Sequence, residues 1–207
     1  MRRQVGFVAV LDAVECYLRV RHGEDVGAVR LLNRLGDARP ASSGPPIAPI
    51  HDRSLATALA RLCGSGDDLL AEVGRAIRTC GPLFEWRVDD GLYYPPGAPI
   101  SGTYRDGNMH TILAEGDDFA MGLFLLEPQV DYLDHRHAAP EFYLNLTGPT
   151  DWRFDFGAWL QLPAGSVLWN DPGRVHATRT GAEPWLSLWA WLSDVDQPCE
   201  VLESRPD

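Results

Sequence analysis

Two histidines, a glutamate and a tyrosine fall within nine positions of one short stretch, DHRHAAPEFYLNLTG (residues 134–148). Side chains two residues apart on a β-strand point to the same face, so His135 and His137 are expected to share one direction. After the Ala-Ala-Pro turn, Glu141 and Tyr143 share a face of the next strand, and the residues that alternate with them are apolar. A polar face of this kind either meets water or lines a binding site.

A second stretch, GSVLWNDPGRVHATRT (residues 165–180), adds His176 after a predicted strand and a Pro-Gly turn. Three imidazoles and one carboxylate on neighbouring strands can bind a divalent first-row ion and leave positions for water or substrate. The candidate metal ligands are therefore His135, His137, Glu141 and His176. This set suits zinc, ferrous iron, manganese or nickel, and the sequence does not choose among them. The other histidines have no comparable neighbours and are expected on the surface or in loops: His22, His51 and His110.

The elements that must position these residues divide the chain in two. Apolar residues recur at helical spacing through residues 1–85, interrupted by a proline- and serine-rich connector, which predicts a helical N-terminal segment. Through residues 86–207, short aromatic-rich runs alternate with glycine and proline turn signals, which predicts short antiparallel strands. We expect a mainly β protein, in which the helical segment packs on a small antiparallel β-barrel as one compact unit. Because such a barrel is filled by side chains or holds one small ligand, its inward-facing residues are the functional candidates.

The two histidine-containing stretches resemble the two conserved motifs of the cupin superfamily. The first motif matches in full, at His135, His137, Glu141 and Gly148. The second has its histidine in place, but the spacing from Gly165 to the Pro-Gly pair is one residue longer than usual, and a threonine stands where asparagine is common. The resemblance implies a cupin barrel, also called a double-stranded β-helix, with a metal ion inside.

A narrower resemblance is to the cupin-type dimethylsulfoniopropionate (DMSP) lyases. It rests on the string YLDHRHAAPEFY, on the LWAW sequence well downstream of His176, and on the helical N-terminal extension. The resemblance implies that the four candidate ligands hold one divalent metal ion, that Tyr143 lies at or next to it, and that Tyr132 lies nearby in the pocket. It also implies a small zwitterionic carboxylate as substrate.

The implied reaction is a β-elimination that gives dimethyl sulfide and acrylate. A base must remove the proton next to the carboxylate, and a free tyrosine titrates too high for this, at a pKa of ~10. A nearby cation favours the phenolate and lowers that pKa, so Tyr143, on the face of Glu141, is the first candidate base and Tyr132 the second. Tyr132 lies three residues before His135, and only a bulge or turn at Leu133 and Asp134 would bring it to the same face.

The sulfonium end of the substrate needs a different partner. In PWLSLWAWLS the three tryptophans, Trp185, Trp189 and Trp191, share one face of a predicted strand. Aromatic faces attract onium cations where water is excluded, so Trp189 and Trp191 are candidate substrate-binding residues. The alternative is that the tryptophans pack between the barrel and the helices, and Trp185 fits that role best. The segment 89–107 is either a mobile cover over the barrel mouth or a plain structural loop.

Two other functions remain open at this stage: another metal-dependent cupin enzyme, such as an oxygenase or isomerase of a small carboxylate, or a non-catalytic ligand-binding cupin. The net charge of −11 disfavours nucleic acid and an anionic membrane as partners. The apolar run near the N-terminus is broken by Asp12 and Glu15 and lacks a cleavage site, so we expect a cytoplasmic protein. The oligomeric state stays open, a homodimer included.

Overall fold

The computed structural model describes residues 2–41, 47–88, 93–95 and 97–202. Its helices are α1 (Arg2–Arg21), α2 (Val26–Leu35), α3 (Asp52–Cys63), α4 (Asp68–Cys80), the 3-10 turn η1 (Gly81–Leu83) and α5 (Gly102–Asp106). Its strands are β1 (Arg39–Pro40), β2 (Asn108–Gly116), β3 (Phe119–Leu126), β4 (Asp131–Arg136), β5 (Glu141–Asn145), β6 (Thr150–Phe154), β7 (Leu160–Leu162), β8 (Val167–Asn170), β9 (His176–Arg179), β10 (Trp185–Trp191) and β11 (Glu200–Val201).

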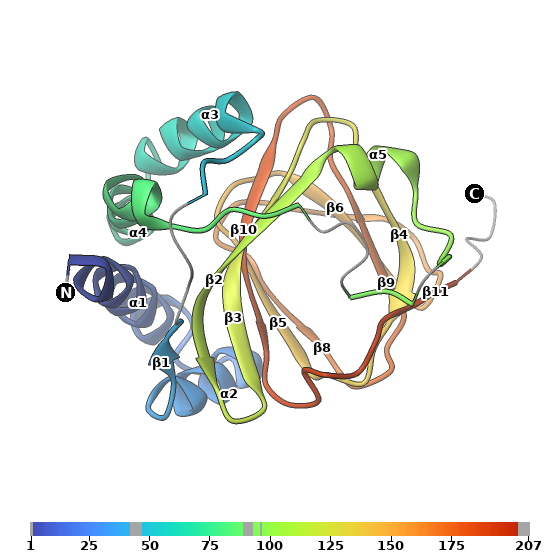
Figure 1. The fold of residues 1–207 in the computed structure, drawn as a ribbon, viewed down its shortest axis with the longest axis horizontal. Coiled ribbons are helices and arrows are strands. Elements are labelled where there is room, and N and C mark those ends of the chain that lie inside the picture. The colour runs from blue at the N-terminus through green and yellow to red at the C-terminus, as the bar shows by residue number, and fades with distance from the viewer. Residues whose placement is uncertain (1, 42–46, 89–92, 96, 203–207) are drawn as a thin grey trace.

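The strands form two antiparallel sheets that face one another and enclose a barrel (Figure 1). The large sheet has the order β1-β2-β3-β10-β5-β8, and the small sheet has the order β11-β4-β9-β6-β7. Helices α1 to α4 lie together against the outer face of the large sheet, on the side away from the barrel interior (Figure 1). This is the predicted arrangement, a helical N-terminal segment packed on a cupin-type barrel.

Two of the covering helices begin at aspartate caps. The Asp25 side chain accepts a hydrogen bond from Ala28 N at the start of α2, and Asp67 accepts from Leu69 N at the start of α4. Each cap satisfies backbone N–H groups that have no partner within the first turn of a helix. Their apolar stripes, which include Leu31 and Ile77, are fully buried in the core shared with the large sheet.

The period-two alternation of β5 separates the core from the barrel interior. Phe142 and Leu144 point toward the helices and belong to the large apolar core. Glu141 and Tyr143 point the other way, into the barrel, although all four side chains are buried. The polar face of this strand therefore does not meet water. This excludes the alternative that Glu141 and Tyr143 are solvent-exposed surface residues.

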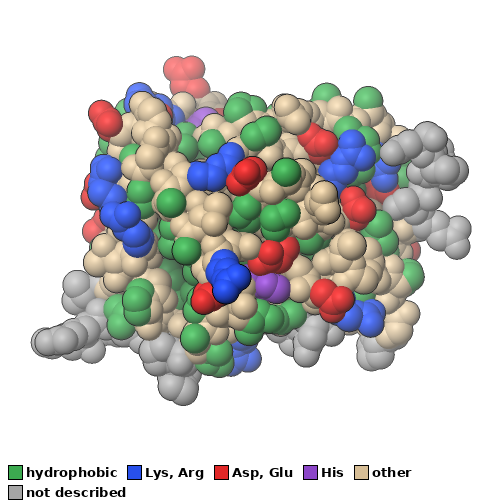
Figure 2. Space-filling view, turned by 90° about the horizontal axis from the view of Figure 1, so that it is seen from above, with side chains coloured by type: hydrophobic (Ala, Val, Ile, Leu, Met, Phe, Trp, Pro, Cys, Tyr) green, Lys and Arg blue, Asp and Glu red, His purple; other side chains and the backbone are tan. Residues whose placement is uncertain are grey.

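Some elements were not expected from the sequence. Residues Arg39–Pro40, inside the predicted connector, form the edge strand β1 by pairing with Ala114 and Glu115 of β2. The short helix α5 lies within the segment 89–107, for which the sequence predicts either a mobile cover over the barrel mouth or a structural loop; residues 89–92 and 96 of that segment lie outside the described residues. No helix among the described residues is long and apolar enough to cross a membrane. Acidic and basic side chains are interspersed on the face seen in Figure 2.

Gly122 of β3 is required by close packing beside the barrel interior. A Cβ at this position would lie 2.1 Å from the Thr111 carbonyl oxygen and 3.1 Å from Trp189 Nε1. We predict that Gly122→Ala lowers the free energy of unfolding by about 1–3 kcal/mol, because the backbone of β2 must move to admit the methyl group. Urea unfolding of both proteins measures the difference. In the control, Gly116→Ala, the nearest neighbour is 3.7 Å away and stability should not fall; equal stability of the two variants would contradict the prediction.

Candidate active site

Three histidine rings from two strands of the small sheet and the turn after β4 meet inside the barrel. His135 of β4 and His176 of β9 are directly opposed in the strand register, and His137 follows the end of β4. One ligand nitrogen from each ring lies within 4.8 Å of the others, and all three residues are buried. The sequence placed His135 and His137 on one face, and the structure brings His176 to them.

Each of the three rings is fixed by a hydrogen bond from Nδ1 to a backbone carbonyl. The distances are 2.8 Å from His135 to Leu133 O, 2.8 Å from His137 to Ala139 O, and 2.9 Å from His176 to Arg174 O. Donation from Nδ1 leaves Nε2 as the nitrogen with the free lone pair, which is how protein scaffolds orient histidine ligands of metal ions.

The donor set fits a divalent first-row ion. His176 Nε2 is buried and has no hydrogen-bond partner among the described residues, although Glu141 Oε2 lies 3.2 Å away. A buried polar atom without a partner is costly, and a metal ion would satisfy it. Three neutral imidazoles and a carboxylate match the ligand preferences of zinc, iron, manganese and nickel alike.

The Glu141 carboxylate lies within this cluster and accepts bonds from both neighbouring strands. Trp191 of β10 donates Nε1–H to Oε1 at 2.8 Å, and Asn170 of β8 donates Nδ2–H to Oε2 at 3.0 Å. Both donors stand directly opposite Glu141 in the sheet register. His137 Nε2 lies 3.2 Å from Oε2 as well.

The charges of this cluster are strongly coupled. Burial works to raise the pKa of Glu141, but His137 and His176 outweigh it and hold the pKa well below its ordinary value. Burial lowers the pKa of His137, yet the charge and hydrogen bond of Glu141 raise it overall. Burial, together with the neighbouring His176 and His137, holds the pKa of His135 well below its ordinary value. The site therefore keeps an ionised carboxylate and a neutral His135, which are the forms that bind metal ions.

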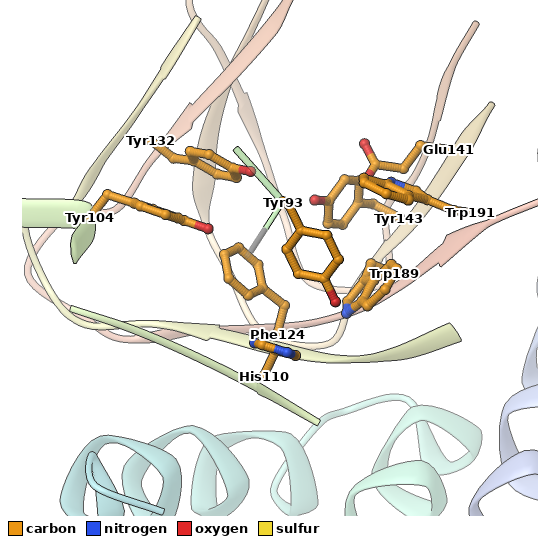
Figure 3. Close-up of a pocket in the computed structure, with 9 residues that line it drawn as sticks. All are labelled: Tyr93, Tyr104, His110, Phe124, Tyr132, Glu141, Tyr143, Trp189 and Trp191. Atoms are coloured by element: carbon orange, nitrogen blue, oxygen red, sulfur yellow. The ribbon is translucent and has the colours of Figure 1, made fainter. Parts of the chain in front are cut away.

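Tyr143 and Tyr132 approach the same cavity from opposite sheets. Their phenol groups point into the space between them, Tyr143 from β5 and Tyr132 from β4 (Figure 3). The ring of Tyr132 stacks on that of His135, with centroids 4.2 Å apart, and its hydroxyl accepts a hydrogen bond from Tyr94. The register of β4 shifts between Tyr132 and His135, so the bulge that Tyr132 requires is present.

A group of three aromatic rings forms the wall of the cavity beside Tyr143. Tyr93, Trp189 and Trp191 meet pairwise at interplanar angles of 71–75°, with centroids 5.4–6.3 Å apart. We call these three residues the aromatic box. Trp185, from the same face of β10, instead packs against Phe124 and Trp152 inside the barrel; it is a packing residue, but the predicted place between the barrel and the helices is wrong.

The cavity contains four residues that the sequence analysis did not name as site residues: Tyr93, Tyr104, His110 and Phe124. Nine residues enclose about 380 Å³, a volume that includes the open mouth: Tyr93, Tyr104, His110, Phe124, Tyr132, Glu141, Tyr143, Trp189 and Trp191. The expectation that His110 lies on the surface or in a loop is wrong, because it is buried on β2 and faces the cavity beside Tyr93 (Figure 3). Alternation on β2 was the available signal: Met109 and Leu113 enter the helix-side core, which turns His110 inward.

Comparison with solved structures gives the same fold over nearly the whole chain. A chain from the crystal structures of the DMSP lyases RdDddP and RnDddQII superposes with a TM-score of 0.70 at 17% identity, covering 97% of this chain and 100% of the other. The crystal structure of DMSP lyase DddQ from Ruegeria pomeroyi DSS-3 gives a TM-score of 0.65 at 19% identity, with 98% of both chains covered. At these identities the two superpositions establish the shared fold alone.

Comparison of sequences is more specific. The DMSP lyase DddQ of Ruegeria pomeroyi is 26% identical over 170 residues, which cover 77% of this chain and 80% of that protein. The family model described as dimethylsulfoniopropionate lyase matches residues 26–187, most of the chain. The chain therefore belongs to the DMSP lyase family.

Proposed function

We propose that this protein is a metal-dependent lyase that cleaves DMSP to dimethyl sulfide and acrylate. The observation that carries the proposal is one cavity and its border: Glu141, two phenols and the aromatic box line the cavity, and the three histidines of the metal-ligand cluster lie directly against Glu141 and Tyr132. A substrate with a carboxylate at one end and an onium group at the other needs these three kinds of partner. Membership of the DMSP lyase family supports the same substrate.

His135, His137, Glu141 and His176 would hold the metal ion. When bound there, a divalent ion supplies Lewis acidity that neutralises the substrate carboxylate and makes the adjacent C–H more acidic. The protein holds three of these ligands through backbone carbonyls and the fourth through Trp191 and Asn170, so the site is organised before substrate arrives.

Tyr143 is the proposed base. As the phenolate, which a metal ion held nearby would favour, its oxygen would accept the proton from the carbon next to the carboxylate. The electron pair of that C–H bond then forms the double bond of acrylate, and the C–S pair leaves with sulfur as dimethyl sulfide. Tyr143 is 5% exposed, and its ring lies against Trp152, so bulk water is largely excluded from the phenol. Tyr132, hydrogen-bonded to Tyr94, is the second candidate.

The aromatic box is the proposed site for the dimethylsulfonium group. Its three rings meet at steep angles, so an onium group between them would contact more than one ring face. Each such contact contributes about 0.5–2 kcal/mol, more where water is excluded. Trp191 belongs both to this box and to the Glu141 hydrogen bonds, which links the two ends of the site.

Removal of the Tyr143 hydroxyl tests the base. We predict that Tyr143→Phe lowers kcat for dimethyl sulfide release by about 10²–10⁴-fold, the contribution of a positioned base, while the bound metal content is unchanged. Gas chromatography of dimethyl sulfide measures the rate, and Tyr132→Phe is the matched variant. If Tyr132→Phe loses this activity and Tyr143→Phe keeps it, the base is assigned to the wrong tyrosine. No release by the unaltered protein with any of the four metals, above a metal-only control, would exclude the lyase reaction.

Metal dependence is tested by removing one ligand. His176→Gln should weaken binding of cobalt(II), used as a spectroscopic probe, by more than tenfold, because one of four donors is lost. His110→Gln is the control: it lies in the same cavity but outside the histidine cluster, and should bind cobalt(II) as the unaltered protein does. Equal affinity of the two variants would show that the histidine cluster is not the metal site.

The aromatic box is tested with a pair of non-reactive ligands of equal shape. We predict that 3-(trimethylammonio)propionate binds about tenfold more tightly than 4,4-dimethylpentanoate, the carbon analogue that keeps the carboxylate but lacks the positive charge, because the rings attract the cation. Isothermal titration calorimetry gives both dissociation constants. Trp189→Leu should remove most of the difference; if the difference persists in that variant, or is absent in the unaltered protein, the onium group binds elsewhere.

A further inference from the structure

The bulge in β4 is the feature that brings Tyr132 and His135 to the same side of the strand. Tyr132 pairs with Thr178 of β9, and His135 pairs with His176. Between these two pairs, β4 has two residues, Leu133 and Asp134, where β9 has one, Ala177. On a regular strand, residues three apart point to opposite faces, so without the bulge Tyr132 would point away from His135.

A buried ion pair is attached to this bulge from two strands away. Arg153 of β6 also stands opposite Ala177, on its other side. Its guanidinium reaches across β9 to Asp134, with Nε 3.2 Å from Oδ1 and Nη2 bonded to Oδ2. The small side chain of Ala177 leaves this path open. The Asp134 side chain is fully buried, and that of Arg153 is 9% exposed.

The outer side of the ion pair is covered by an indole ring. The Arg153 guanidinium carbon lies 4.5 Å from the centroid of the Trp159 ring, and that of Arg179 lies 4.3 Å from the same ring. Arg179 of β9 pairs with Asp151 of β6 at 3.1 Å, at a more exposed position. The molecule thus carries two neighbouring ion pairs, of which the Asp134–Arg153 pair is attached to the bulge.

Stability alone is a weak reason for burying this pair. The cost of removing two charges from water offsets most of their attraction, and apolar residues of the same volume often stabilise a protein equally well. A bidentate ion pair between a guanidinium and a carboxylate does, however, fix the relative position and orientation of the two side chains. The backbone around Asp134 is held as well, since its carbonyl accepts from Leu202 N at 2.8 Å.

The bulge also sets the orientation of a proposed metal ligand. The Leu133 carbonyl accepts the hydrogen bond from His135 Nδ1 at 2.8 Å, so the position of the bulge determines which nitrogen of that ring carries the proton. The same segment holds the Tyr132 ring against His135 at 4.2 Å. Movement of residues 133 and 134 would change both.

We propose that Asp134 and Arg153 are positioning residues, whose ion pair holds the β4 bulge and thereby the tautomer of His135 and the place of Tyr132. The expected loss of metal affinity rests on the metal site of the proposed function. The expected change in the His135 tautomer does not, because it is observed in the metal-free protein.

The test replaces the pair by apolar residues of similar size, Asp134→Leu with Arg153→Met. The double variant should fold with an unchanged or higher Tm, because no buried charge is left alone. It should bind cobalt(II) about 10–100-fold more weakly, as expected when the support of a metal ligand is lost. Long-range ¹H–¹⁵N NMR of the metal-free protein should show His135 with its proton on Nδ1 before the change, and a mixture of tautomers after it.

The matched control is Asp151→Leu with Arg179→Met. It removes the neighbouring ion pair between β6 and β9, whose arginine packs on the same Trp159 ring. It should leave cobalt affinity and the His135 tautomer unchanged. If the Asp134–Arg153 double variant does not fold, Asp134→Asn decides: it keeps the shape but weakens the bidentate interaction, and the same changes should appear in smaller measure.

A folded variant of the Asp134–Arg153 pair with cobalt affinity within twofold of the parent and an unchanged tautomer would overturn the proposal, and so would equal changes in the control. The two proposals fail separately. A parent protein that binds no cobalt(II) contradicts the proposed function, while a changed tautomer in the variant would still support the positioning role.

Discussion

The site depends on one buried carboxylate. Glu141 is 3% exposed, and an ionised carboxylate that leaves water without compensation is very costly. His137 and His176 supply part of the compensation, and the sheet supplies the rest, because Trp191 and Asn170 occupy the register positions on either side of Glu141 and each donates to one of its oxygens. The strand order β10-β5-β8 is therefore a requirement of the site, since another order would separate the carboxylate from its donors.

The helices make this interior available for polar residues. In a small barrel without a covering layer, the interior face of the strands would have to supply the apolar core. Here the outer face of the large sheet packs against α1 to α4, so residues such as Phe142 and Leu144 are buried outside the barrel. The interior is then free to hold the histidine cluster, two phenols and the aromatic box. Fold and site are thus linked through the N-terminal helices, although those helices contribute no residue to the cavity lining.

Local periodicity explains what could be predicted from the sequence. Alternation along β5 and β10 placed Glu141, Tyr143 and Trp189 on inward faces, since a period of two is a property of each strand alone. What could not be predicted depends on contacts between distant segments. Tyr93 lies in the cavity through contacts with residues far along the chain: its carbonyl accepts a hydrogen bond from Cys199 N at 2.7 Å, and its ring meets Trp189 and Trp191.

The edge strand β1 was not expected for the same reason. Arg39–Pro40 is extended only because β2 offers an unpaired edge there, and a proline is tolerated at such an edge. No local signal in a proline-rich connector predicts a pairing partner so far along the chain, as between Pro40 and Ala114 or Arg39 and Glu115. The histidine cluster was more predictable. The residue types and spacing within residues 134–148 and 165–180 indicate metal ligands, whatever path the chain takes between the two stretches.

The metal ligands alone do not select one reaction, since the same donor set serves oxygenases, isomerases and lyases on similar barrels. The discriminating feature is where proton acceptors and aromatic faces lie relative to those ligands. Tyr143 stands two residues beyond Glu141 on one strand and directly opposite Trp189 on the next, so the proposed base lies between the carboxylate-binding end and the onium-binding end. An elimination needs its base at that place, because the proton lost and the group that leaves are on adjacent carbons. The arrangement of β5 and β10 thus brings a carboxylate, a phenol and aromatic faces to one cavity wall, which is a stronger argument for the proposed reaction than the histidine cluster alone.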